Sequence, residues 1–163
     1  MLKNKWIVAA MMLATLFMVA CNAVKTKTKS DTDKGVVTTI SMPATVKNGD
    51  QVRLSMEVKN NGNADCRFLK WNSPFEPAFL GDYLHITDEK GEKVSYRGAM
   101  AKRMWPPPED AYLTLRPGGS LKAEIVISQA YDITKPGDYT IKFQGQEGEG
   151  ALSNSNSVNF KVK

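Results

Sequence analysis

The chain has 163 residues, a net charge of +5, one histidine and two cysteines. A single histidine excludes a His-Glu-x-x-His zinc site and a zinc finger, and no Gly-x-Ser-x-Gly nucleophile motif occurs in the sequence. Basic residues alternate with acidic ones rather than forming a stripe, which argues against nucleic-acid binding. We therefore expect a protein that is not an enzyme, has no metal or cofactor and has no nucleic-acid partner.

Residues 1–20 have the features of a secretory signal peptide. Lys3 and Lys5 form a positively charged start, and residues 6–19 are an almost unbroken apolar stretch. That stretch is short for a membrane span, which needs about 20 apolar residues. It ends beside Ala20, a small residue of the kind that precedes a cleavage site. We expect the signal to be removed after residue 20.

The cysteine that follows this signal indicates a particular class of signal peptide. Met18-Val19-Ala20-Cys21 resembles the lipobox of bacterial lipoproteins. We expect Cys21 to become the mature N-terminus and to carry acyl chains such as palmitate, which together anchor a protein stably in a bilayer. Asn22 follows in place of aspartate, which by resemblance to Gram-negative lipoproteins favours the outer membrane, facing the periplasm or the cell surface. A plain signal peptide or an uncleaved anchor is the alternative.

Residues 21–34 are expected to form a flexible polar tether. The run from Lys25 to Lys34 holds basic, hydroxyl and acidic residues and almost no apolar surface, a composition typical of a solvated spacer. Attraction of its lysines to anionic lipid headgroups is the other interpretation. The folded domain is then expected to span residues 35–163 and to work in the cell envelope, outside the cytoplasm.

From residue 36 onward the sequence predicts an all-β domain. Val52, Leu54, Met56 and Val58 alternate with polar residues, as in a strand with one buried face. Turn signals rich in Gly, Pro and Asn separate nine such segments. The segments are 36–42, 51–59, 65–71, 83–87, 93–96, 111–115, 120–128, 137–144 and 157–162. This spacing predicts an immunoglobulin-like (Ig-like) antiparallel β-sandwich with Greek-key connections.

Three single residues are interpreted from their place in these segments. Cys66 lies in an alternating segment and is expected to be a small buried side chain, with a reactive thiol as the alternative. If Cys21 is acylated, Cys66 has no partner for a disulfide, so the domain depends on its core. His85 is expected on the polar face of a strand. Trp71 is expected in the core, near the centre of one sheet.

The strongest candidate for partner binding is a proline-rich segment. Consecutive prolines hold the backbone extended, which lowers the entropy cost of binding, and Trp and Arg are frequent interface hot spots. The candidate residues are Lys102, Arg103, Met104, Trp105, Pro106, Pro107 and Pro108. In the alternative interpretation, Trp105 folds back to cap the sandwich and the prolines form a rigid crossover between sheets.

A second candidate surface holds Phe75 and Phe79, which prolines separate in the sequence. Both rings could face a partner from a loop. A long crossover loop also needs apolar side chains that hold it on the core, and in the alternative interpretation these rings are such side chains.

Several stretches together resemble a known family. They include Leu69-Lys-Trp-Asn-Ser-Pro-Phe-Glu76, Val94-Ser-Tyr-Arg-Gly98, Pro106-Pro-Pro-Glu-Asp110 and Tyr112-Leu-Thr-Leu-Arg-Pro-Gly118. Their order and spacing are similar to the non-catalytic N-terminal domain of deuterolysin-like, peptidyl-lysine metalloendopeptidases, over residues 36–163. The resemblance implies the fold, and a module that binds, restrains or helps to fold a partner as a pro-domain does. It does not imply proteolysis, because the His-Glu-x-x-His motif of that family is absent.

These observations lead to one main hypothesis and two alternatives. The main hypothesis is a lipid-anchored, non-catalytic envelope protein that binds a protein partner, as inhibitor or chaperone of a secreted or envelope protease. The first alternative is a structural spacer lipoprotein without a ligand cleft, and burial of Trp105 would favour it. The second is a small hydrolase that uses serine or carboxylate side chains.

Overall fold

The computed structural model describes residues 35–163, and the predicted signal peptide, Cys21 and the tether lie outside the described residues. The described strands are β1 (Val36–Ser41), β2 (Thr45–Val46), β3 (Arg53–Asn60), β4 (Cys66–Leu69), β5 (Leu84–Thr87), β6 (Tyr112–Leu115), β7 (Ser120–Val126), β8 (Gly137–Phe143) and β9 (Ser157–Val162). Two short 3-10 helices, η2 (Glu109–Ala111) and η3 (Ile127–Gln129), accompany them. Within this part of the chain, no helix has the length and hydropathy of a membrane span.

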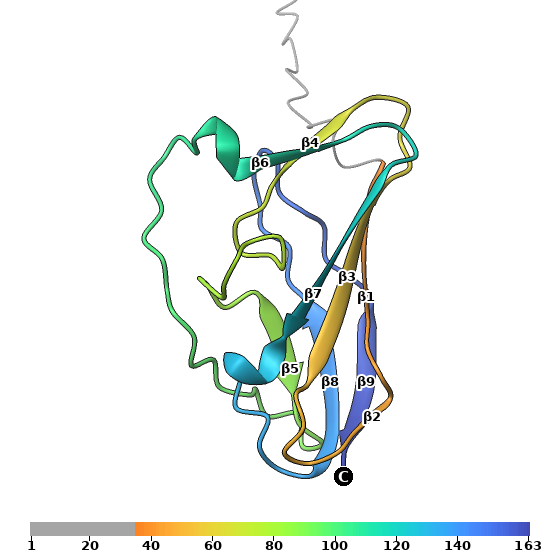
Figure 1. The fold of residues 1–163 in the computed structure, drawn as a ribbon, viewed down its shortest axis with the longest axis vertical. Coiled ribbons are helices and arrows are strands. Elements are labelled where there is room, and N and C mark those ends of the chain that lie inside the picture. The colour runs from red at the N-terminus through yellow and green to blue at the C-terminus, as the bar shows by residue number, and fades with distance from the viewer. Residues whose placement is uncertain (1–34) are drawn as a thin grey trace, which may run out of the picture.

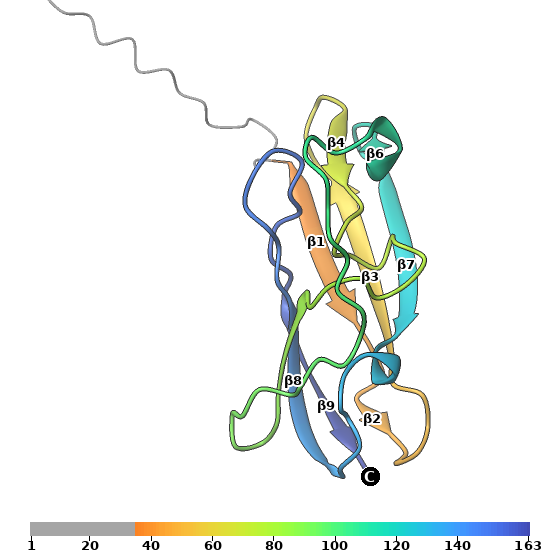
Figure 2. The same ribbon diagram turned by 90° about the vertical axis from the view of Figure 1, so that its left-hand side faces the viewer.

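The strands form two main layers that face each other (Figures 1 and 2). One sheet has the order β1-β3-β7 and the other the order β2-β9-β8-β5, while β4 and β6 form a separate pair. The pairing is antiparallel except between β2 and β9, which run parallel. The predicted all-β, Ig-like sandwich is therefore confirmed, with one parallel pair that the sequence did not indicate.

The core lies between these two layers. On β3, Leu54, Met56 and Val58 are fully buried, as the alternation in the sequence predicts. Ile86 of β5 and Ile141 of β8 are equally buried and face them within one apolar cluster. Each such side chain contributes about 2 kcal/mol when it leaves water. The period-2 pattern thus positions the strands directly, because each apolar residue of the pattern reaches the same core.

The predicted strand at residues 93–96 is wrong. Val94 donates its N–H to Ile86 of β5 at 2.8 Å, but Arg97 donates to Ala130 at 2.7 Å. The segment therefore changes its neighbour within a few residues and makes only isolated bridges, at Lys93 and at Tyr96. No single partner strand runs alongside it, so alternation alone is insufficient for a strand here.

The predictions for Cys66 and His85 are confirmed, whereas the one for Trp71 is wrong. Cys66 is buried on β4, as expected, and burial raises the pKa of its thiol, which keeps it protonated and unreactive at neutral pH. His85 is an exposed residue of β5, also as expected. The prediction for Trp71 is wrong, because this residue lies in a turn beyond the end of β4 and is only half-buried. Its ring faces a side chain of a distant loop instead of the sheet.

Asn60 joins two turns at one end of the sandwich. Its side chain is buried, and its Nδ2 donates to the carbonyls of Ala64 at 2.8 Å and Leu115 at 2.9 Å. Its Oδ1 accepts the N–H of Gly62 at 2.9 Å. One amide therefore holds the turn after β3 against the end of β6, and an apolar residue would leave these groups unpaired.

We expect Asn60→Ala to lower the free energy of unfolding by about 2 kcal/mol, because buried polar groups lose their partners. Urea unfolding followed by circular dichroism measures this change. Asn63→Ala is the matched control, since Asn63 is an exposed residue of the same turn, and it should change stability by less than about 0.5 kcal/mol. Equal losses in the two variants would contradict the role of Asn60.

Candidate partner-binding loop

The connection from β5 to η2 carries the most exposed apolar side chains of the described chain. Met100, Met104 and Trp105 are 73%, 82% and 77% exposed. Among the described residues, Val37 on β1 is the only other large apolar residue that is exposed, at 45%. Three solvated apolar side chains within six residues are unusual for a stable loop, because each one forgoes the free energy of burial.

Arg103 holds the middle of this loop against the body of the domain. Its Nη2 lies 2.8 Å from both carboxylate oxygens of Glu76, whose side chain is only 4% exposed. The same carboxylate accepts the N–H of Asn72 at 2.7 Å. The guanidinium carbon lies 4.9 Å from the ring centroid of Trp71, which adds a cation–π contact. Arg103 therefore points inward while its neighbours Lys102 and Met104 point to solvent.

Further hydrogen bonds fix the loop before and after Arg103. Ala101 donates its N–H to Leu80 at 2.9 Å. The Tyr96 hydroxyl donates to the carbonyl of Ala99 at 2.7 Å, and burial raises the pKa of this hydroxyl, so it stays protonated as a donor. Ala111 donates to the carbonyl of Pro108 at 3.0 Å, where η2 begins. Met104 and Trp105 are thus presented by a loop with several fixed points.

The structure places the proline-rich candidates as follows. Lys102, Pro106 and Pro108 are exposed, whereas Pro107 is buried. The chain bends at residues 105–106, where the Trp105–Pro106 peptide bond is cis. The exposure of Trp105 contradicts the alternative in which this ring caps the sandwich. That alternative failed because the inward position is occupied by Arg103 instead of by an aromatic ring.

The two phenylalanines of the second candidate surface contact the core. Phe75 lies edge-to-face with Phe68 of β4, with ring centroids 5.5 Å apart. Phe79 stacks on Tyr83 at 5.4 Å and meets Tyr131 edge-on at 5.9 Å. These contacts favour the interpretation as apolar plugs of a crossover loop, so we do not include the two rings in the candidate surface.

Sequence reasoning missed the residue that holds the loop. Glu76 is buried, yet nothing in its local pattern marks it as the partner of a residue 27 positions later. The available signal was an acidic residue between two apolar aromatic residues of one segment, because buried acids are rare unless they are paired. Met100 belongs to the same exposed set as Met104 and Trp105.

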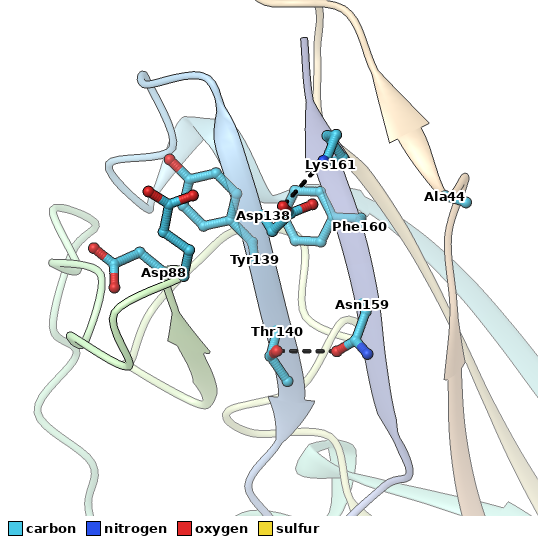
Figure 3. A pocket seen from close by; sticks show the side chains of 9 residues that line it. Ala44, Asp88, Asp138, Tyr139, Thr140, Asn159, Phe160 and Lys161 are labelled. Atoms are coloured by element: carbon cyan, nitrogen blue, oxygen red, sulfur yellow. Dashed lines mark hydrogen bonds and ion pairs between the residues drawn. The ribbon is translucent and has the colours of Figure 1, made fainter.

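A pocket of about 410 Å³ lies against β8 and β9, beside the turn that follows β5 (Figure 3). Polar groups that line the pocket pair with one another. Asp138 forms an ion pair with Lys161 at 3.0 Å, and Thr140 donates a hydrogen bond to Asn159 at 2.9 Å. Asp88 accepts backbone N–H groups of its own turn. Within residues 35–163 no group of three or more potential metal ligands occurs. We therefore assign no ligand to this pocket.

Comparison with known proteins identifies the fold family. The family model of the immunoglobulin-like domain matches residues 39–150, so the chain belongs to the immunoglobulin-like domain family. This match agrees with the two-layer sandwich and includes the whole of the exposed loop. Membership shows the fold, and a fold does not by itself determine the function.

Two relatives are proteases by name. The chain is 34% identical over 124 residues to an "Extracellular protease" of Aeromonas hydrophila, covering 69% of this chain and 34% of that protein. It is 27% identical over 115 residues to "Neutral protease 2 homolog MEP6" of Coccidioides posadasii (strain C735), covering 68% and 32%. The chain therefore spans about a third of each relative, and it is related to proteases over part of their length. This agrees with the predicted relation to a protease-associated, non-catalytic domain.

Among solved structures, a β-glucosidase from Listeria innocua aligns with a TM-score of 0.40 and 10% sequence identity, covering 78% of this chain and 16% of that chain.

We expect Arg103→Met to lower the free energy of unfolding by about 3 kcal/mol, because it leaves the buried Glu76 carboxylate without its cation. The double variant Arg103→Met/Glu76→Gln should regain part of this loss, since glutamine still accepts the N–H of Asn72 without a buried charge. Urea unfolding of the single and double variants measures both effects. Lys102→Met, which changes an exposed neighbour, is the control, and a loss equal to that of Arg103→Met would contradict the anchoring role.

Proposed function

We propose that this chain is a non-catalytic, immunoglobulin-like module that binds a protein partner through the loop of residues 100–108. The partner is a secreted or envelope protease, which the module inhibits or helps to fold. The observation that carries the proposal is the exposure of Met100, Met104 and Trp105 on a loop that Arg103 and Glu76 hold in place.

The physics of such a loop suits protein binding. Trp is a common hot spot, and Met adapts its shape to a partner surface. Burial of each exposed side chain in a partner contributes about 2 kcal/mol. Because the loop is already held by several hydrogen bonds, less conformational entropy is lost on association. A loop held in this way can contribute to affinity even when its contact area is small.

The relatives favour a protease as the partner. Both are named as proteases, and the chain corresponds to about a third of each. A module related to part of a protease has a surface that evolved beside a catalytic domain, so a protease is the class of partner whose surface it fits best. The solvated loop would then meet the cleft or the flank of that catalytic domain.

The proposal also includes a lipid anchor at Cys21. Acyl chains on Cys21 would hold the module on the outer membrane, and the polar tether would let the domain reach a partner at the bilayer surface. One relative is described as extracellular, which supports a location outside the cytoplasm.

The binding proposal predicts capture of a metalloprotease by the full chain from the envelope and secreted fractions of the source cells. Mass spectrometry identifies the captured protein, and titration of the purified pair gives the dissociation constant. Met104→Ala/Trp105→Ala should raise that constant about 30-fold or more, since a single hot-spot residue already contributes about 2 kcal/mol or more.

The matched control is Val37→Ala, which removes the remaining exposed large apolar side chain of the described residues from β1. It should change the dissociation constant by less than about two-fold. Equal weakening by both variants would contradict the loop as the binding surface. Capture of no protease by the wild-type chain would contradict the proposed partner, whatever the loop variants do.

The anchor proposal predicts that the full chain incorporates a labelled fatty acid and sediments with membranes. Cys21→Ser should lose the label and move to the soluble fraction, because no acyl chain remains to enter the bilayer. Cys66→Ser is the control and should keep the label, since Cys66 is buried within the domain. Membrane association that Cys21→Ser leaves unchanged would contradict the anchor.

A further inference from the structure

The edges of the two main sheets differ in how their backbone groups are covered. At the β1 edge, the side-chain amide of Asn156 binds both the N–H of Ile40, at 2.9 Å, and its carbonyl, at 3.1 Å. At the β5 edge, the N–H of Leu84 reaches the Tyr131 hydroxyl at 2.9 Å, and the Ile86 carbonyl accepts Val94. The β2 edge is only two residues long. The β1 and β5 edges are therefore covered at one or two residues each, and the β2 edge is short.

The β7 edge is different. β7 is the last strand of the order β1-β3-β7, and it runs along the margin of its sheet (Figure 2). Seven residues long, it is the longest edge strand of the described domain. Ile127 donates to Val52, and Asn60 donates to Gly119, so odd-numbered residues direct their backbone groups to β3. In an antiparallel ladder the alternate residues then direct theirs outward.

The outward backbone groups of β7 belong to Ser120, Lys122, Glu124 and Val126. Among the described residues, the N–H and C=O groups of Ser120, Lys122 and Glu124 have no backbone hydrogen-bond partner, and η3 begins directly after Val126. Such a row is a template for another strand, and natural proteins usually cover it. The β7 edge thus offers the longest row of such groups among the edges of the two main sheets.

The inward-facing side chains of β7 are also less completely buried than those of β3. The inward residues of β3, Leu54, Met56 and Val58, are fully buried. Their counterparts on β7, which are Leu121, Ala123 and Ile125, are only partly buried, although Leu121 and Ile125 pack against the same core. Solvent therefore reaches these side chains along the edge, and a strand beside β7 would cover them.

The sequence of β7 is complementary to itself under a two-fold axis. If two copies pair antiparallel about Ala123, Lys122 lies opposite Glu124 of the second copy, and Leu121 lies opposite its Ile125. This register also pairs all seven residues. A slip of one residue is forbidden because outward backbone groups would meet inward ones. Registers centred on Lys122 or Glu124 place like charges opposite each other.

We propose that β7 pairs with β7 of a second copy of this chain, in a closed two-fold dimer centred on Ala123. The two three-stranded sheets then form one continuous sheet, and both open edges disappear. The in-chain pairs Lys122–Glu57, at 3.5 Å, and Arg53–Glu124, at 2.9 Å, extend the alternation of charge across the junction. This inference is independent of the loop of residues 100–108.

The test uses the purified full chain with a single introduced cysteine. In a pair that exchanges no hydrogen bonds, the two Cα atoms at position 123 lie about 4.5 Å apart, which suits a disulfide. Ala123→Cys should form a cross-linked dimer under mild oxidation, with the 123–123 bond identified by mass spectrometry. Lys122→Cys and Glu124→Cys are register controls and should cross-link far less, because each lies opposite a different residue. Comparable cross-linking at all three positions overturns the proposal.

Charge variants test the same register without any cysteine. Sedimentation velocity of the full chain should show a dimer whose dissociation constant rises about ten-fold in Lys122→Glu or in Glu124→Lys, because like charges then face each other. The double variant Lys122→Glu/Glu124→Lys should restore dimerisation. Both charges are exposed, so unchanged circular dichroism is expected throughout. A wild-type chain that sediments as a monomer, or a dimer that charge reversal leaves unchanged, overturns the proposal even if Ala123→Cys fails to fold.

Discussion

Everything else in this domain depends on burial of alternate side chains between two sheets. The described residues contain one cysteine, so no disulfide within them supports the fold. Leu54 and Met56 of β3 therefore have to meet Ile141 of β8 across the core without any covalent restraint. This constraint explains why the central strands are so regular, since a slip of one residue would move their apolar side chains to solvent.

The long connections are held by a different kind of interaction. The middle of the connection between β5 and β6 is fixed by the ion pair of Arg103 with the buried Glu76, and not by an apolar side chain in the core. A buried ion pair adds little net stability because both charges lose water, but breaking it is costly. Arg103 Nε is buried without a partner among the described residues, which further lowers the net stability that the pair adds. The pair therefore determines which conformation the loop adopts, and Trp105 remains outside as a consequence.

The sequence predicts the sandwich well because period-2 alternation reports burial directly, as it does for Val52 to Val58. It fails at residues 93–96, where the chain changes neighbours and alternation carries no information about a partner. The candidate loop was found from its prolines and Trp105, but its anchor was not. The pairing of Arg103 with Glu76 joins residues far apart in the chain, and Trp71 was placed in the core because a large aromatic side chain gives no sign of whether a sheet or a cation covers it.

The open β7 edge raises the question of selectivity, because an uncovered strand can pair with any extended chain. Charged side chains are the usual protection, and here Lys122 and Glu124 are both exposed on the strand. An incoming strand that places a like charge opposite either of them is repelled, whereas a second copy of β7 places an opposite charge beside both at once. The protection is therefore selective. Pairing through β7 also brings two loops of residues 100–108 into one particle, and two linked binding surfaces raise the apparent affinity for a clustered partner without any new contact.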